Sequence, residues 1–403
     1  MPSASADRVG AVRAILIAAT ACKREEARLT PPPPSTRPEV PPLATLASVE
    51  APASPDETSG NAAVLPSTDW LAFVRETEER REAFLVRPNG RDLRKLPLPR
   101  GATGAFPADA HPDGAALVGI AVQDVGDHHS EQLVVWPLGP SKTKEPVVLV
   151  GPASGRSRNP VVSPDGKRIA FESGAESFSD LYVVDLGGTN LKRLTRNAEG
   201  NFEPVWSADG SSLAFTTSRD GDPEVYRMSA DGSAQERLTA FHLEDGAPRW
   251  ARSGDRIAFL SNREGAHAIF LMKSDGTGQR RVLPALAKSN AFSEPAERDP
   301  AWSPDGSKLA LVRPGKGGKA AIHLVDVASG EARALTDGTA QDDQPTFSPD
   351  GQFLAFVSDR TGSSQIWIMR VDGSRQTRVT TSDASDWRPV WVPRSTGDRA
   401  APL

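Results

Sequence analysis

A turn of the form Ser-Pro-Asp-Gly recurs along the chain, each time between a short apolar segment and a second segment resembling Leu-Ala-Phe. Five copies occupy Pro160–Phe171, Pro204–Phe215, Pro248–Phe259, Pro300–Leu311 and Pro345–Phe356. Their turn glycines are 44, 44, 52 and 45 residues apart. A period of about 40–45 residues with several short strands per repeat is typical of β-propeller blades. The repeat therefore predicts an all-β ring.

Each repeat predicts four strands, a to d, joined by tight turns. Strand a is the segment Pro204–Trp206 in one copy, and strand b is Leu213–Phe215. The turn between them suits Pro, which fixes φ, and Gly, which accepts positive φ. Strand c is an apolar segment such as Ile269–Met272, and an Asp-Gly hairpin turn such as Asp231–Gly232 leads to strand d. Strand d ends in a Leu-Thr pair.

Two weaker copies complete the count. One spans Phe106–Val150, and the other begins at Trp70–Phe73 but lacks a strand a. The segment Trp387–Trp391 near the C-terminus is a strand a with nothing after it. We therefore expect a seven-bladed propeller of four-stranded blades, closed by the C-terminal strand completing the first blade. The alternatives are six or eight blades, or a strand a supplied by Ala62–Thr68. The seven strand-b centres are Phe73, Val118, Phe171, Phe215, Phe259, Leu311 and Phe356.

Large side chains occupy one position of strand a, and they are predicted to pack between neighbouring blades rather than to stack on nucleic-acid bases. These residues are Trp206, Trp250, Trp302, Phe347 and Trp391, with Val162 in a sixth copy.

The N-terminus predicts export. Arg8 and Arg13 precede a short apolar run that ends at Cys22, the one cysteine of the chain. This order resembles a bacterial lipoprotein signal over residues 1–22, with Cys22 as the lipidated residue; an ordinary export signal is the alternative. Residues 23–64 are rich in proline and predict a disordered tether, followed by the propeller at 65–393 and a disordered tail at 394–403. Lys23 favours anchoring to the outer membrane.

The repeat resembles the TolB-type propeller repeat, a WD40-like unit of bacterial envelope proteins that also occurs in prolyl oligopeptidases. The resemblance covers about residues 65–393 and implies a periplasmic scaffold that recognises protein or peptide partners. TolB itself carries an additional N-terminal α/β domain and a six-bladed ring, whereas here a proline-rich segment precedes the repeats.

A catalytic constellation is not recognised, so we expect no enzyme activity and no cofactor. The Gly-x-Ser-x-Gly motif of the peptidase relatives is missing from the sequence. Among six histidines, His242 lies in a loop with Glu244 and Asp245 as the only faint metal-like cluster, and a solvated loop explains this group equally well. A single cysteine excludes a cysteine-based zinc site and an intramolecular disulfide. The net charge of −5 gives no nucleic-acid footprint.

Charged residues gather just before each strand a, where loops from different blades should surround a channel mouth. The candidate partner-binding residues are Glu203, Asp245, Asp299, Asp343, Gln344, Asp386 and Arg388. Converging carboxylates would focus negative potential and attract a basic segment; surface solvation is the alternative. The loop residues Arg219, Arg263 and Arg360 recur regularly, which favours a structural role.

These patterns predict a monomeric, lipid-anchored, periplasm-facing propeller that binds an envelope protein or peptide, with the lipid as its sole membrane contact. The alternative is a metal-dependent lyase or hydrolase acting on a carbohydrate or lactone at the channel mouth.

Overall fold

The computed structural model describes residues 69–394, with the exception of residues 126–127, 139–144, 151–155, 175–178, 198 and 286–296. The side chains of residues 125, 128 and 129 are also excluded from the description. Cys22, the predicted tether and the tail beyond residue 394 lie outside the described residues. Among the described residues, no helix has the length and apolar character needed to span a membrane.

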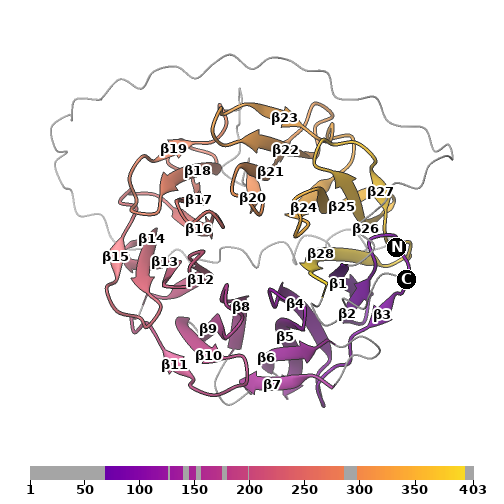
Figure 1. Cartoon of the computed structure of the whole chain (residues 1–403), viewed down its shortest axis with the longest axis horizontal. Helices are drawn as coiled ribbons and strands as arrows, with labels where there is room; N and C mark the ends of the chain where they lie inside the picture. The colour runs from indigo at the N-terminus through magenta and orange to yellow at the C-terminus, as the bar shows by residue number, and fades with distance from the viewer. Residues whose placement is uncertain are drawn as a thin grey trace, which may run out of the picture. The chain divides into compact units, whose positions relative to one another are not determined.

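Seven four-stranded antiparallel sheets form a ring (Figure 1). Blade 1 contains β28 (Ser385–Val392), β1 (Trp70–Glu76), β2 (Arg81–Val86) and β3 (Arg94–Lys95). Blade 2 contains β4 (Gly104–Ala110), β5 (Ala116–Val125), β6 (His128–Pro137) and β7 (Val147–Val150). Blade 3 contains β8 (Arg156–Val162), β9 (Arg168–Gly174), β10 (Asp180–Asp185) and β11 (Lys192–Arg193). Blade 4 contains β12 (Asn201–Trp206), β13 (Ser212–Asp220), β14 (Asp222–Ser229) and β15 (Glu236–Arg237).

Blade 5 contains β16 (Asp245–Trp250), β17 (Arg256–Ser261), β18 (Ala268–Lys273) and β19 (Arg280–Arg281). Blade 6 contains β20 (Arg298–Trp302), β21 (Lys308–Pro314), β22 (Ala320–Asp326) and β23 (Ala332–Ala334). Blade 7 contains β24 (Asp342–Phe347), β25 (Phe353–Thr361), β26 (Ser363–Arg370) and β27 (Thr377–Arg378). Strand a of every blade lies innermost and strand d outermost (Figure 1).

The Ser-Pro-Asp-Gly phrase forms the predicted turn between strands a and b. In blade 3, Gly166 has φ 73° and its N–H donates to Ser163 O. The Ser163 hydroxyl donates to Asp165 and accepts from the N–H of Arg168, which begins strand b. Serine, aspartate and glycine therefore each satisfy one need of the turn: an acceptor for the next strand, an acceptor for the serine, and positive φ.

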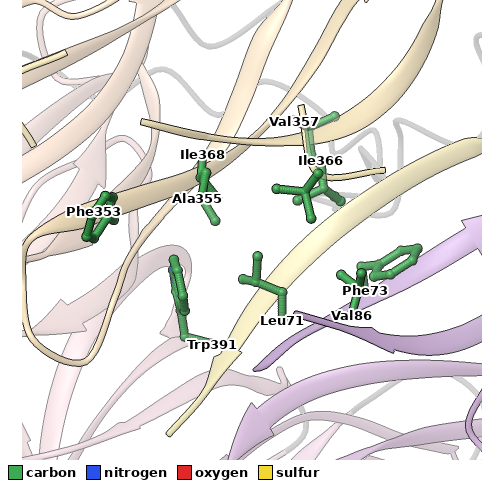
Figure 2. Packing of buried hydrophobic residues seen from close by; sticks show 10 residues of the cluster. Leu71, Phe73, Val86, Phe353, Ala355, Val357, Ile366, Ile368 and Trp391 are labelled. Atoms are coloured by element: carbon green, nitrogen blue, oxygen red, sulfur yellow. The ribbon is translucent and has the colours of Figure 1, made fainter. Parts of the chain in front are cut away.

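The ring is closed as predicted, by the C-terminal strand. β28 pairs antiparallel with β1, with Leu71 opposite Trp391. Across the seam between blades 7 and 1, both side chains belong to one buried cluster with Phe353 and Ile368 of blade 7 (Figure 2). Closure removes the free edges that an open ring would expose.

The core consists of layers between blades, and the strand-a aromatics contribute to it as predicted. Trp206 of blade 4 packs in one cluster with Ala170 and Leu181 of blade 3. Its indole N–H donates to Val161 O at 3.1 Å, and Trp391 repeats this bond to Thr346 O at 3.1 Å. The seven predicted strand-b centres are all fully buried. Apolar packing therefore joins the blades, and at three interfaces an indole N–H of strand a adds a hydrogen bond to the preceding blade, the third being Trp302 to Arg249 O at 2.8 Å.

Candidate functional site

Six innermost strands carry a residue with positive φ directly before a proline. Their φ angles lie between 45° and 59°, and each strand's register with its strand b shifts there, as in a β-bulge. Positive φ is uncommon for residues other than glycine, and it is further disfavoured before proline. We call these six positions the inner rim: Asn159, Glu203, Ala247, Asp299, Gln344 and Arg388.

Hydrogen bonds connect the inner rim from one blade to the next. Glu203 Oε2 accepts from Ala247 N at 3.0 Å. Asp299 Oδ2 accepts from Gln344 N at 3.4 Å, and Gln344 Oε1 accepts from Arg388 N at 2.7 Å. Ala247 has no polar side chain, so this series of hydrogen bonds does not continue from Ala247 to Asp299. These predicted binding residues therefore also stabilise the strained bulges of their neighbours.

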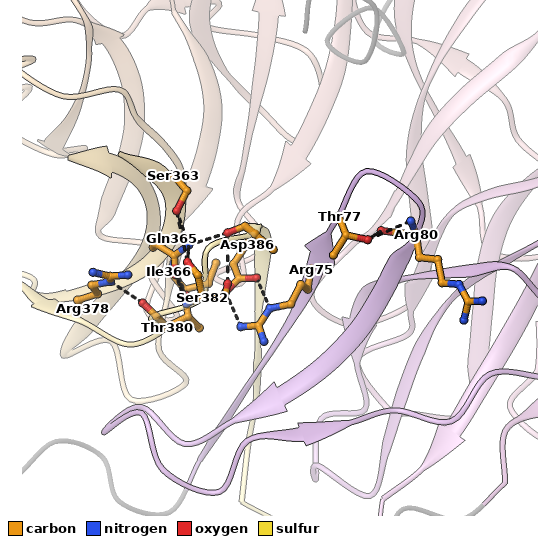
Figure 3. Close-up of polar contacts among 11 residues, drawn as sticks. Arg75, Thr77, Arg80, Ser363, Gln365, Ile366, Arg378, Thr380, Ser382 and Asp386 are labelled. Atoms are coloured by element: carbon orange, nitrogen blue, oxygen red, sulfur yellow. Dashed lines mark hydrogen bonds and ion pairs between the residues drawn. The ribbon is translucent and has the colours of Figure 1, made fainter. Parts of the chain in front are cut away.

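Two of the predicted mouth residues are buried inside their blades. The side chains of Asp245 and Asp386 are 0% exposed. Asp245 Oδ2 pairs with Arg263 at 2.5 Å, and Asp386 accepts from both Nε and Nη2 of Arg75 at 2.7 and 2.8 Å (Figure 3). Their carboxylates hold arginines in place, so the acidic groups left near the ring centre are Glu203, Asp299 and Asp343.

The recurring loop arginines have the structural role predicted for them. Arg263 donates to Ser261 Oγ, Gln279 Oε1 and Asp245, and its guanidinium lies over the rings of Phe259 and Phe270. Arg219 and Arg360 repeat this arrangement in blades 4 and 7. We call this unit, one arginine with its ring pair and its glutamine, the arginine platform.

Near the innermost strands of blades 6, 7 and 1, charged side chains of both signs lie close together. Arg298 pairs with Asp343, and the two side chains are 26% and 15% exposed. Desolvation raises the pKa of Asp299, with Arg298 opposing the shift. Desolvation also lowers the pKa of Arg388, and the charge of Arg249 adds to this effect. The site is therefore mixed in charge rather than mainly acidic.

Sequence reasoning missed Glu172, Arg249 and the pair Arg158–Glu131. Glu172 Oε1 accepts from Asn159 Nδ2 and from Glu203 N, each at 2.6 Å. Its side chain is buried, and desolvation raises its pKa from 4.5 to about 7. A lone glutamate directly after the Ile-Ala-Phe of strand b was the available signal.

The histidines are placed differently from the sequence expectation. Glu244 contacts His267 Nε2 at 3.1 Å, while His242 forms a tilted ring pair with Phe241, with ring centroids 4.6 Å apart. Desolvation lowers the pKa of His323 to about 4. Within the part of the chain that the structure describes, no group of three or more His, Cys, Asp or Glu residues is arranged to hold a metal ion.

The chain matches the family model of the TolB beta propeller domain over residues 129–295 and 285–398. An uncharacterized protein of Agrobacterium fabrum is 41% identical over 98 residues, which are 24% of this chain and 32% of that protein. In a second curated relative, the Tol-Pal system protein TolB of Geobacter sulfurreducens, the matched stretch spans 18% of the length. The chain thus covers a third or less of these relatives.

Solved structures share the fold. TolB from Acinetobacter baumannii is 21% identical, with a TM-score of 0.50 over 80% of this chain and 83% of that one. An oligogalacturonate lyase in complex with manganese is 17% identical, with a TM-score of 0.53 over 79% and 86%. Likeness at this level of identity shows the fold alone. The family model, in contrast, covers most of the chain, including all of blades 3 to 7, and this protein therefore belongs to the TolB beta propeller domain family.

Proposed function

We propose that this chain is a binding scaffold of the bacterial cell envelope, and that its inner rim receives a basic segment of an envelope protein. The observation that carries the proposal is the rim itself. Separate blades carry Glu203, Asp299 and Asp343 on their innermost strands, each at or directly beside a residue with positive φ. Fixed carboxylates from several blades would attract and orient a cationic peptide.

The mixed charge suggests how such a segment would be oriented. Glu203 and the buried Glu172 lie in blades 4 and 3, whereas Arg298 and Arg388 lie in blades 6 and 1. A bound segment would place its basic residues toward blade 4, where Glu203 accepts only from Thr216 Oγ1 and Ala247 N and forms no ion pair within the described residues. Its own acidic groups would face blades 6 and 1. The inner rim would then select the orientation of the bound segment as well as its charge.

The test uses charge-neutral variants that keep an acceptor oxygen for the rim bonds. We expect Glu203→Gln, Asp299→Asn and Asp343→Asn, combined, to reduce crosslinking to the partner in intact envelopes and to reduce the salt dependence of capture. The matched control removes one exposed carboxylate from a hairpin turn, in Glu331→Gln. Unchanged capture by the triple variant, with normal folding, would exclude the rim as the binding site.

We further propose that the propeller faces the periplasm as a monomer and is tethered by lipidated Cys22. Metabolic labelling with a fatty acid should mark the full chain but not Cys22→Ala. Labelling of both, or of neither, would contradict the anchor. Membrane fractionation then distinguishes the outer membrane from the inner one.

An enzymatic use of the same rim is the second candidate, because an oligogalacturonate lyase shares the fold. The candidate predicts bound metal in the purified protein and a lower melting temperature after chelation. The scaffold proposal predicts that chelators leave the melting temperature unchanged.

A further inference from the structure

The arginine platforms of blades 4, 5 and 7 differ in what covers them. In each, the arginine donates to a glutamine 16 residues later, and that glutamine bonds to the carbonyl of a leucine from the preceding blade. That leucine begins a Leu-Thr pair, and in blade 5 the second residue after the pair, Phe241, lies over the platform. The residue at the equivalent position is Asn197 in blade 4 and Gly338 in blade 7.

The platform of blade 5 is covered by the chain itself. In blade 5, Arg263 lies over a third ring, that of Phe241, at 5.1 Å from the centroid. In blade 7 the equivalent residue is Gly338, which has no side chain to lie over Arg360; an added Cβ there would lie 2.8 Å from Gly315 Cα, in the turn between β21 and β22. The phenylalanine shows which kind of group such a platform accepts: an aromatic ring stacked near a guanidinium.

The platform of blade 4 is open. Arg219 lies over two rings, those of Phe215 and Tyr226, at 5.6 and 4.7 Å. The short Asn197 side chain bonds to Asn201 and Thr217 in place of a third ring. A cavity of about 300 Å³ remains, lined by Leu194, Arg196, Asn197, Arg219 and Gln235. We call it the blade-4 notch. Because an apolar cavity of roughly 150 Å³ suffices for benzene, the notch has room for a side-chain ring.

A free cation lies at the edge of the notch. Arg196 is exposed, and within the described residues its side chain makes no hydrogen bond or ion pair, unlike Arg219, which makes three hydrogen bonds. A guanidinium matches a carboxylate in geometry and charge. The notch thus combines space for a ring beside Arg219 with a charge for an adjoining acidic group.

We propose that the blade-4 notch binds an aromatic residue at the C-terminus of a partner protein, with the ring beside Arg219 and the terminal carboxylate on Arg196. The ring would occupy the place that Phe241 fills in blade 5. This site is separate from the inner rim, and it requires an anionic ligand end where the rim proposal requires a cationic segment. Failure of one proposal would therefore leave the other intact.

The test uses the full chain and N-acetyl-phenylalanine with a free carboxylate, observed by saturation-transfer NMR. We expect Asn197→Phe, which copies blade 5, to weaken binding by about fivefold or more, as loss of one cation–π contact predicts. The opposite exchange, Ala240→Arg with Phe241→Asn, copies blade 4 into blade 5 and should add a second site of similar affinity. Circular dichroism checks that both variants fold.

Arg196→Ala separates the two contacts without touching the fold. It should bind N-acetyl-phenylalanine and its neutral amide equally, whereas the wild type should prefer the acid. N-acetyl-alanine should bind neither protein. The proposal is overturned if the wild type does not bind the acid, or if Asn197→Phe and Arg196→Ala both bind it as the wild type does. It is also overturned if the blade-5 exchange folds and adds no site.

Discussion

Blades 5 and 1 contain the same buried polar unit, built from different parts of the chain. In blade 5, Asp245 pairs with Arg263, 18 residues later, and Arg263 covers Phe259 and Phe270. In blade 1, Asp386 pairs with Arg75, 311 residues away, and Arg75 covers the equivalent rings. A unit that organises one blade locally thus joins the two ends of the propeller where the ring closes (Figure 3).

The two units also differ in how completely their carboxylates are bonded. Both oxygens of Asp386 accept from Arg75, and Ser382 Oγ donates to Oδ2 as well. In Asp245 one oxygen is buried without a partner among the described residues. The closing unit is therefore the better satisfied, and its loss should cost more stability.

The largest effect is expected from removing the closing strand. A chain ending at Ala384 lacks β28 and exposes the apolar faces of blades 7 and 1, including Leu71 and Phe353. We expect loss of cooperative urea unfolding and a tendency to aggregate, measured by tryptophan fluorescence and light scattering. A chain ending at Arg394 is the control and should unfold as the full chain does. Cooperative unfolding of the shorter chain would contradict closure by β28.

Replacing the two aspartates compares the units directly. Asp386→Ala leaves Arg75 without its bidentate partner, and we expect a loss of about 3–5 kcal/mol in the free energy of unfolding. Asp245→Ala should cost less, because one unsatisfied oxygen disappears with the carboxylate. Urea midpoints measure both. Equal losses in the free energy of unfolding would show that the unit in the closing blade stabilises the protein no more than the unit in blade 5.

Glu172 shows what happens to a buried carboxyl that lacks such an arginine pair. Its pKa is raised to about 7, so the folded state holds a proton that the unfolded state loses above its ordinary value of 4.5. Stability should therefore fall as pH rises from about 4.5 to 7, by up to ~1.4 kcal/mol per pH unit. Glu172→Gln should flatten this part of the stability curve. An unaltered curve would assign the pH dependence to other groups.

The smallest effect is expected for the hydroxyl beside Asp386. Ser382→Ala removes a hydroxyl that lies 3.2 Å from both Asp386 Oδ2 and Ala384 O while Arg75 remains bound, and about 1 kcal/mol should be lost. The urea midpoint again provides the measurement. A loss as large as that of Asp386→Ala would mean that the serine, rather than the arginine, holds the aspartate in place.

The fold could be predicted because every blade repeats the same local signals. The Asp-Gly turns, the Leu-Ala-Phe strands and the unmatched Trp387–Trp391 segment each depend on neighbouring residues alone. Seven strand-b centres and the closing strand were therefore found from sequence, although the closing blade lacks the Ser-x-Arg loop and uses Arg75 instead.

The site was predicted less well because charge in sequence does not reveal burial. Asp245 and Glu203 both lie near a strand a, yet one is fully buried and the other is only partly buried on the inner rim. The bulges before proline decide this difference, and so does the blade-to-blade bonding that connects Gln344 to Arg388. Arg249 on β16 and Glu172 on β9 also belong to the site, but the sequence pattern of these strands indicates only a structural role for their residues.

Hydrogen exchange of β28 tests the central claim, that residues from both ends of the propeller build one closed blade. We predict that amides of Ser385–Val392 are protected as strongly as those of β24, the equivalent strand of blade 7, and that Asp386→Ala lowers protection in β28 and β1 together. Rapid exchange of β28 in the wild type, at the rate of a chain end, would contradict the closed ring.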